Sequence, residues 1–220
     1  VVDAVVEFLQ NNELFNSIHN APLKHDGIEV KMQEDLYGTV TFSGKTYKIK
    51  GLLDYLVINH NNYPVELFPG LVLEPLTYTE IDLKCSSFKN VIAGIQFNRW
   101  DFQRAFYREL VINNLPDGYV QGRSGLLFCN IENLSLEYYS FNALDLETTL
   151  GKTIPDKYKT EEWLMANLFS KYLTILHAFM LVEYYGDDLE KPRLNKTYKE
   201  NNTIVYNDKL RLYGREIYPE

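Results

Sequence analysis

Three charged residues, Asp54, Asp82 and Lys84, have types and spacing that could hydrolyse a phosphodiester bond. Asp82 and Lys84 are two positions apart in a strand-like segment, so their carboxylate and ammonium groups would emerge side by side on one face. Asp54 lies inside the apolar run 52–57, where an unpaired charge would be costly. Mg²⁺ takes one or two protein carboxylates and completes its octahedron with water and substrate phosphate. A neighbouring lysine can then stabilise developing negative charge.

Each part of this pattern also has a plain structural interpretation. Acid-x-lysine triplets arise by chance in a chain this rich in acids and lysines, and a second one occurs at Glu29-Val30-Lys31. Such a triplet is usually a cross-pair of charges on the surface of a strand. The site hypothesis therefore depends on the combination of the triplet with an acid in a separate apolar strand.

The charge balance limits the partners of the chain. Thirty acids against twenty-two bases give a net charge of −8, which excludes a wide footprint on duplex DNA. The segment 89–123 is locally basic, with five bases against three acids. Its bases are Lys89, Arg99, Arg104, Arg108 and Arg123. A nucleic-acid partner would have to be held there.

Composition indicates a folded chain in a reducing compartment. Its 220 residues suit one domain, and 45% apolar with 14% aromatic residues exclude disorder as the main state. No apolar run reaches the roughly 18 residues of a membrane span, so we expect no membrane partner. Two cysteines are too few for a disulfide scaffold, which favours a cytoplasmic protein. The start at Val1, without Met or a signal-like segment, suggests a trimmed or processed chain.

The elements that would position these residues follow from hydrophobic periodicity. We predict helices at 1–17, with a break at Asn11-Asn12, at 99–113 with Asn98 as its cap, and at 160–185. We predict strands at 28–32, 40–42, 47–49, 51–58, 80–85, 125–131, 134–141 and 203–206, with turns at 37–38 and 43–44. The segment 59–78, with three prolines, is predicted to be a long loop or an irregular hairpin. This order predicts one α/β (α+β) domain over 1–220, with a core at about 28–150 and a C-terminal helix and tail at 160–220. Its central mixed β-sheet would be flanked by helices.

Three segments together resemble the PD-(D/E)XK nuclease pattern, and more narrowly the RecB-like and lambda-exonuclease-like phage exonucleases. The segments are 50–54 (KGLLD), 81–87 (IDLKCSS) and 100–107 (WDFQRAFY). That family carries a "K-G-x-x-D" strand, a "D-L-K-T-S" strand and a "Y-D-x-Q-x-A-x-Y" helix. The helix is the most specific match, at Asp101, Gln103, Ala105 and Tyr107. The resemblance covers about 28–150 and implies a restriction-endonuclease-like core.

The resemblance also implies roles for individual residues. Asp54 and Asp82 would bind Mg²⁺ (or Mn²⁺), Lys84 would be the catalytic lysine, and Gln103 would orient the lysine, the water or the substrate end. Tyr107 lies one helical turn further along the same face. We expect Tyr107, Arg104 and Arg108 to contact DNA. Ser86 would either contact a phosphate or cap a turn after its strand.

The chain departs from the family pattern in three respects. Asp54 and Asp82 are 28 positions apart, longer than the common hairpin, which indicates an insertion within 59–78. The family adds a His or Glu ligand from an early element, for which His25, Glu7 and Glu29 are candidates; we expect Glu29, which opens the strand before Asp54. Two cysteines exclude the four-cysteine iron–sulfur branch. Cys85, beside Lys84, is interpreted as a small buried residue.

Two classes of function therefore compete. The first is a Mg²⁺-dependent DNA nuclease, an exonuclease of phage-type recombination or replication in a bacterial or phage-infected cell. It could form a homo-oligomeric ring around DNA, as related exonucleases do, or act with a recombination or replication partner protein. The second is a catalytically silent nuclease-fold protein that acts as a binding or structural partner in a larger assembly. A restriction-type endonuclease is disfavoured because the Gln103–Tyr107 helix is exonuclease-like.

Overall fold

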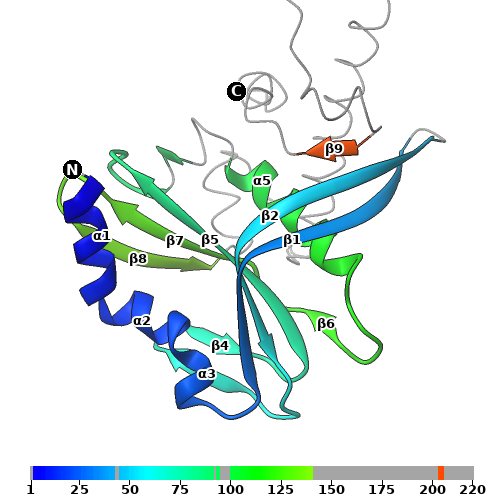
Figure 1. Cartoon of the computed structure of the whole chain (residues 1–220), viewed down its shortest axis with the longest axis horizontal. Coiled ribbons are helices and arrows are strands. Elements are labelled where there is room, and N and C mark those ends of the chain that lie inside the picture. The colour runs from blue at the N-terminus through cyan, green and yellow to red at the C-terminus, as the bar shows by residue number, and fades with distance from the viewer. Residues whose placement is uncertain (1, 43–44, 92, 95–99, 141–202, 206–220) are drawn as a thin grey trace, which may run out of the picture. The chain divides into compact units, whose positions relative to one another are not determined.

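The structure is a computed structural model that describes residues 2–42, 45–91, 93–94, 100–140 and 203–205 (Figure 1). Its helices are α1 (Val2–Asn11), α2 (Glu13–His19), α3 (Ala21–Lys24) and α5 (Trp100–Ile112). Its strands are β1 (Ile28–Phe42), β2 (Lys45–Asn59), β3 (Val65–Phe68), β4 (Leu71–Leu73), β5 (Thr77–Ser86), β6 (Val120–Gln121), β7 (Gly125–Asn130), β8 (Ser135–Ser140) and β9 (Thr203–Val205). The predicted helix at 160–185 and the cap Asn98 lie outside the described residues.

The fold is mixed α/β, with a central mixed sheet flanked by helices, as predicted. Within the described residues, seven strands form this sheet in the order β1-β2-β5-β7-β8, with β6 beside β5 and β9 beside β2. β2 runs antiparallel to β5, β5 runs parallel to β7, and β7 runs antiparallel to β8. β9 adds a short parallel pairing to β2, which confirms the predicted strand there.

Local chemistry explains the helical start of the chain. The side chain of Asn12 accepts hydrogen bonds from the backbone N–H groups of Leu14 (3.0 Å) and Phe15 (3.2 Å). This N-cap satisfies two donors at the start of α2 and separates it from α1. The predicted break at Asn11-Asn12 is therefore confirmed.

The predicted turn at Tyr37-Gly38 is wrong, because β1 continues through both residues. Gly38 is needed for close packing instead: a Cβ at this position would lie 2.9 Å from the Cβ of Asn113, the residue after α5. The Asn113 side chain also accepts a hydrogen bond from the backbone N–H of Thr39 (3.1 Å). The glycine that suggested a turn is therefore the place where the end of α5 packs closely against β1.

The segment 59–78 holds the predicted irregular hairpin, in which β3 and β4 pair as a separate two-stranded sheet. The buried side-chain amide of Asn59 donates to the carbonyl oxygens of Tyr63, Leu73 and Glu74, which lie on either side of that hairpin. One buried amide therefore anchors the insertion to the end of β2.

The chain divides into two compact units, each built from separated segments. The first comprises Val1–Asp35, Leu52–Val91 and Asn114–Phe141, and the second comprises Leu36–Gly51, Ile92–Asn113 and Asn142–Glu220. The single domain over 1–220 stays a prediction.

The core of the first unit lies between the sheet and its N-terminal helices. Side chains of alternate residues on β5 and β7, among them Ile81 and Leu127, pack with Ile18 of α2 and Tyr55 of β2. A second cluster joins Cys129 of β7 to α1. Because successive strand residues point to opposite faces, the intervening residues of β5 face away from these helices.

In the second unit, α5 packs directly on β2. Phe106 and Leu110, four residues apart on one face of the helix, are fully buried. A Cβ on Gly51 would lie 2.5 Å from Leu110 Cδ1 and 3.0 Å from Tyr107 Cε1. The glycine of the K-G-x-x-D segment is thus the point where the helix touches the strand backbone.

Candidate functional site

Asp54, Asp82 and Lys84 emerge from the same face of two neighbouring strands. Leu56 of β2 pairs with Glu80 of β5, and the last paired residues before Asp54 are Tyr55 and Ile81. Cross-strand partners share a face, and residues two positions apart along a strand share it too. The three predicted site residues therefore lie together with Glu80, on the face away from α1 and α2.

Asp54 is tied to the neighbouring strand by its side chain. Its Oδ2 accepts a hydrogen bond from the backbone N–H of Leu83 (2.8 Å), and its Oδ1 accepts one from Gln33 Nε2 (3.1 Å). Leu83 is the residue between Asp82 and Lys84, so the Asp54 carboxylate lies against that part of β5. Burial, followed by the Asp54 carboxylate, raises the pKa of Tyr55 to about 12.

Asp82 and Lys84 form a close ion pair. Lys84 Nζ lies 2.7 Å from Asp82 Oδ2, and the side chains are 20% and 3% exposed respectively. The lysine side chain is therefore partly exposed, whereas the aspartate side chain is buried. A lysine held this way carries a positive charge at the edge of the carboxylate pair, which is where a phosphate would be attracted.

Glu80 is an acid that the sequence interpretation missed. It is almost fully buried on the same face, and its carboxylate accepts hydrogen bonds from Gln121 Nε2 and Ser124 Oγ. These contacts attach β6 and the residue before β7 to β5. The alternation of three charged residues with Ile81 and Leu83, at Glu80-x-Asp82-x-Lys84, was the signal that could have identified it.

Gln33 is the second residue that sequence did not identify. Its backbone φ is positive (53°), a conformation that residues other than glycine seldom adopt. Its side-chain amide donates a hydrogen bond to the Asp54 carboxylate. Backbone strain of this kind costs on the order of 1 kcal/mol or more and concentrates at functional sites. No pattern in the sequence marks Gln33, because its role depends on the register of β1 against β2.

The prediction that Glu29 is a metal ligand is wrong. Glu29 lies four residues from Gln33 along β1, which is about 13 Å of strand. Its carboxylate instead lies 3.0 Å from His60 Nε2 and 3.8 Å from Lys31 Nζ. His60 Nδ1 lies 2.8 Å from the hydroxyl oxygen of Tyr119, so Glu29 belongs to a separate cluster just beyond the C-terminal end of β2.

The carboxylates of Asp54 and Asp82 suit a hard divalent cation. From the Leu83 hydrogen bond and standard bond lengths, Asp54 Oδ2 lies at most about 8 Å from the Asp82 carboxyl carbon. Among the described residues, no group of three or more His, Cys, Asp or Glu is arranged for a metal ion. Two carboxylates are nevertheless a sufficient protein share for Mg²⁺, which keeps several waters.

Gln103 and Tyr107 share one face of α5, as their spacing predicts. Gln103 Nε2 donates to the Tyr107 hydroxyl oxygen (3.0 Å). Both residues belong to the second unit, whereas Asp54, Asp82 and Lys84 belong to the first. The prediction that Gln103 faces these three residues therefore stays a prediction.

Arg104 and Arg108 are not presented to solvent. Arg104 is 0% exposed and Arg108 is 7% exposed. An arginine that binds a phosphate backbone needs an accessible guanidinium. Their predicted contact with the DNA backbone is therefore wrong: this face of α5 is directed into the protein, and the two arginines are internal residues.

Ser86 caps a turn, which was one of its two predicted roles. Its Oγ accepts a hydrogen bond from the backbone N–H of Phe88 (3.2 Å), and its carbonyl oxygen accepts one from the N–H of Ile131 (3.1 Å). These bonds end β5 and join it to the residue after β7. A phosphate contact by Ser86 stays a prediction.

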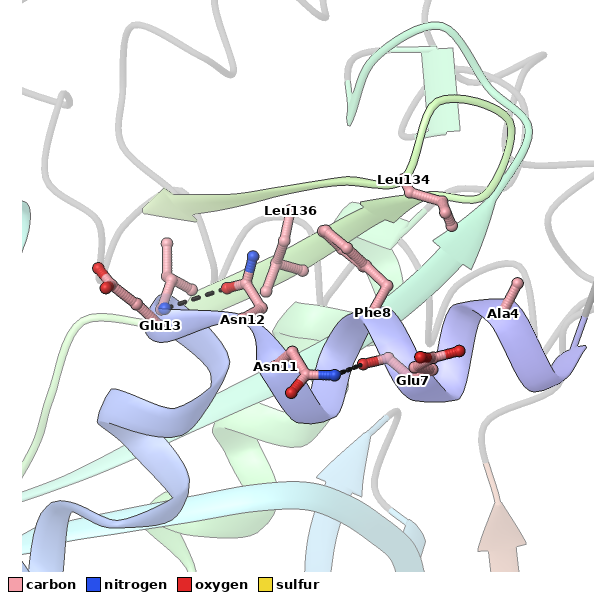
Figure 2. A pocket seen from close by; sticks show the side chains of 9 residues that line it. Ala4, Glu7, Phe8, Asn11, Asn12, Glu13, Leu134 and Leu136 are labelled. Carbon is pink, nitrogen blue, oxygen red and sulfur yellow. Dashed lines mark hydrogen bonds between the residues drawn. The ribbon is translucent and has the colours of Figure 1, made fainter.

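A surface groove of about 710 Å³ lies beside α1, the start of α2 and β8 (Figure 2). Phe8 of α1 points towards Leu136 of β8, and Glu7 and Glu13 lie at the border. Glu7, one of the candidates for the additional metal ligand, lines this groove, whereas Asp54, Asp82 and Lys84 do not. Separately, no helix among the described residues combines the length and apolar character that crossing a membrane requires.

Comparison with known proteins leaves the family open. No protein-family model and no curated protein matches the chain. Among solved structures, "Crystal structure of SSO0001" matches with a TM-score of 0.36 and 16% identity, over 65% of this chain and 60% of that one. A similarity of this size carries no argument about function.

Proposed function

We propose that the chain is a metal-dependent deoxyribonuclease that hydrolyses phosphodiester bonds in DNA. The observation that carries the proposal is the hydrogen bond from the Leu83 N–H to Asp54, which holds this carboxylate beside Asp82 and Lys84. A sheet face with two carboxylates and one partly exposed lysine has the groups that this hydrolysis requires.

Each residue would have a distinct task. Asp54 and Asp82 would hold Mg²⁺ or Mn²⁺, which when bound makes its water more acidic and neutralises phosphate charge. Gln33 and the Leu83 N–H fix the orientation of the Asp54 carboxylate. Lys84 would stabilise the negative charge that develops on the phosphate oxygens in the transition state. Gln103 would position the lysine, the water or the substrate end.

The alternative is a catalytically silent protein that binds a partner through the same fold. The net charge of −8 and the burial of Arg104 and Arg108 favour it, because they reduce the positive surface available to DNA. The Asp82–Lys84 pair beside Asp54 favours turnover, since two carboxylates and a partly exposed lysine are the groups that metal-dependent hydrolysis uses. We retain the exonuclease of phage-type recombination or replication, acting in the cytoplasm, as the specific form of the proposal.

A direct assay separates these functions. Linear and nicked-circular duplex DNA are incubated with the protein and Mg²⁺ or Mn²⁺, with EDTA as the negative control. An exonuclease degrades the linear DNA and acts on the circle only from its nick, whereas an endonuclease linearises the circle. Asp82→Asn should abolish hydrolysis, and Glu66→Gln, at an exposed position on β3, should preserve it. Intact DNA with both metals would reject the nuclease and favour the silent protein.

A further inference from the structure

Cys85 and Cys129 lie directly opposite each other on two parallel strands. In the register of β5 and β7, Cys85 pairs with Cys129. Paired residues of neighbouring strands point to the same face, so the two thiols lie side by side, and each contributes to the pKa shift of the other. Both are free cysteines, so the chain holds a pair of neighbouring thiols, one on β5, the strand that carries Asp82 and Lys84, and one on β7.

The two thiols differ in access. Cys85 is exposed, contrary to its interpretation as a small buried residue, because it lies near the end of β5. Cys129 is fully buried in a cluster with Val5 and Leu9 of α1. A small oxidant can therefore reach Cys85 from solvent, whereas Cys129 is reached most readily by the sulfur of Cys85.

The strand spacing permits a bond between the two sulfurs but does not favour it. Neighbouring strands are about 4.8 Å apart, within the Cα–Cα range of about 4.4–6.8 Å that disulfides span. The two Cβ atoms of a disulfide lie about 3.5–4.5 Å apart. The Cβ atoms of Cys85 and Cys129 must therefore approach each other slightly more closely than the strand spacing of about 4.8 Å. A disulfide formed under such strain is easily reduced.

We propose that Cys85 and Cys129 form a thiol modification site that hydroperoxides oxidise to a labile disulfide. The Cys85 thiol first loses its proton; the thiolate then attacks an oxygen of hydrogen peroxide, the O–O bond breaks, and hydroxide leaves. This hydroxide takes up the released proton, so the products are a sulfenic acid on Cys85 and one water. The Cys129 sulfur then attacks the Cys85 sulfur; the S–S bond forms, the S–O bond breaks, and the Cys129 proton leaves with the departing oxygen as a second water. The two thiols lose two electrons and hydrogen peroxide is reduced to two waters.

The environment makes the first step slow at neutral pH. Burial is the main cause of a raised pKa for Cys85, with a further contribution from the Asp54 carboxylate, while Cys129 and Lys84 act in the opposite direction. Burial and Cys85 raise the pKa of Cys129 to about 11. Because the thiolate is the nucleophile, oxidation should accelerate as the pH rises above neutrality.

The test is oxidation of the full chain with hydrogen peroxide, followed by intact-mass measurement and peptide mapping under non-reducing conditions. We expect a product lighter by two hydrogen atoms, with a cross-link between the peptides of Cys85 and Cys129. Reduced glutathione should restore both thiols. A cross-link that resists glutathione would overturn the labile disulfide, and a Cys85 sulfinic acid with Cys129 still free would overturn the site.

Single variants separate the two roles without depending on activity. In Cys129→Ala, oxidation should stop at a Cys85 sulfenic acid, which the probe dimedone labels at least tenfold more than in the unsubstituted chain. In Cys85→Ser, the buried Cys129 should remain reduced. Equal dimedone labelling of Cys85 with and without Cys129, in protein whose circular dichroism spectrum is unchanged, would show that Cys129 does not resolve the sulfenic acid.

Discussion

Asp54 Oδ2 lies 2.8 Å from the backbone nitrogen of Leu83 and accepts its hydrogen bond, so a side chain of β2 is bonded to the backbone of β5. Asp82 and Lys84 flank Leu83 and both point to the opposite face from its side chain. The bond therefore fixes one carboxylate beside the acid and the lysine of the neighbouring strand. It also gives Asp54 a partner in an apolar strand, where an unpaired charge would be costly.

We expect Mg²⁺ or Mn²⁺ to stabilise the folded chain through Asp54 and Asp82. A ligand at 100 times its Kd adds about 2.7 kcal/mol, so the metal should raise Tm and EDTA should reverse the shift. Asp82→Asn should remove this shift, because the ion loses one of two carboxylates. Glu29→Gln is the matched control and should keep it, since Glu29 lies with His60. An equal metal shift in Asp82→Asn would contradict a site built on this residue.

Lys84→Ala should lower kcat by roughly 10²-fold or more, with DNA affinity little changed, if the ammonium acts mainly in the transition state. Single-turnover kinetics and equilibrium binding measure the two quantities separately. Lys31→Ala, which removes a lysine paired with Glu29 and Glu34, is the control and should change neither. Equal losses in binding and turnover would instead make Lys84 a simple phosphate contact.

Local patterns predicted most of the elements around this site. The alternation in β5, the apolar run in β2 and the cap at Asn12 are properties of neighbouring residues, and each matches the structure. The choice between Glu29 and Gln33 depends on how β1 pairs with β2. A shift of one residue in that register reverses the face to which every side chain points. The sequence therefore identified Asp54 but not its partner.

Helical spacing has the same limit on α5. Positions four apart correctly place Gln103 and Tyr107 on one face, and their hydrogen bond shows it. The spacing does not say which face is directed inwards. Arginine is usually exposed, and this general tendency predicted the wrong environment for Arg104 and Arg108.

Arg104→Ala should destabilise the fold instead of weakening DNA binding. Removing a fully buried guanidinium leaves a cavity and disturbs the groups packed around it, with an expected loss of about 3 kcal/mol. Urea denaturation measures the loss, and Arg123→Ala, at an exposed position, should stay within about 0.5 kcal/mol. If the variant is as stable as the unsubstituted chain and its DNA binding depends less on salt, Arg104 contacts the DNA backbone after all.

The Cys129 thiol should make the protein less stable in alkali. Its pKa is about 11 in the folded chain against an ordinary value of 9.0. Above pH 9 the unfolded chain loses this proton while the folded chain keeps it, so the free energy of unfolding falls between pH 9 and 11. The loss is on the order of 2 kcal/mol. Cys129→Ala should remove it, and an identical pH profile in that variant would exclude the thiol as the cause.

Gln103→Ala tests whether α5 contributes to the chemistry. Gln103 is half-buried and its amide donates to the Tyr107 hydroxyl, so we expect the variant to lower turnover with little change in the free energy of unfolding. Tyr107→Phe separates positioning from catalysis, because it removes the acceptor but keeps the ring beside Gly51. If the tyrosine only positions the amide, Tyr107→Phe should lose less activity than Gln103→Ala, and both should bind DNA as the unsubstituted chain does. Full turnover in Gln103→Ala would show that this glutamine of α5 takes no part in the reaction. The proposed site would then consist only of Asp54, Asp82 and Lys84 on the face of the sheet.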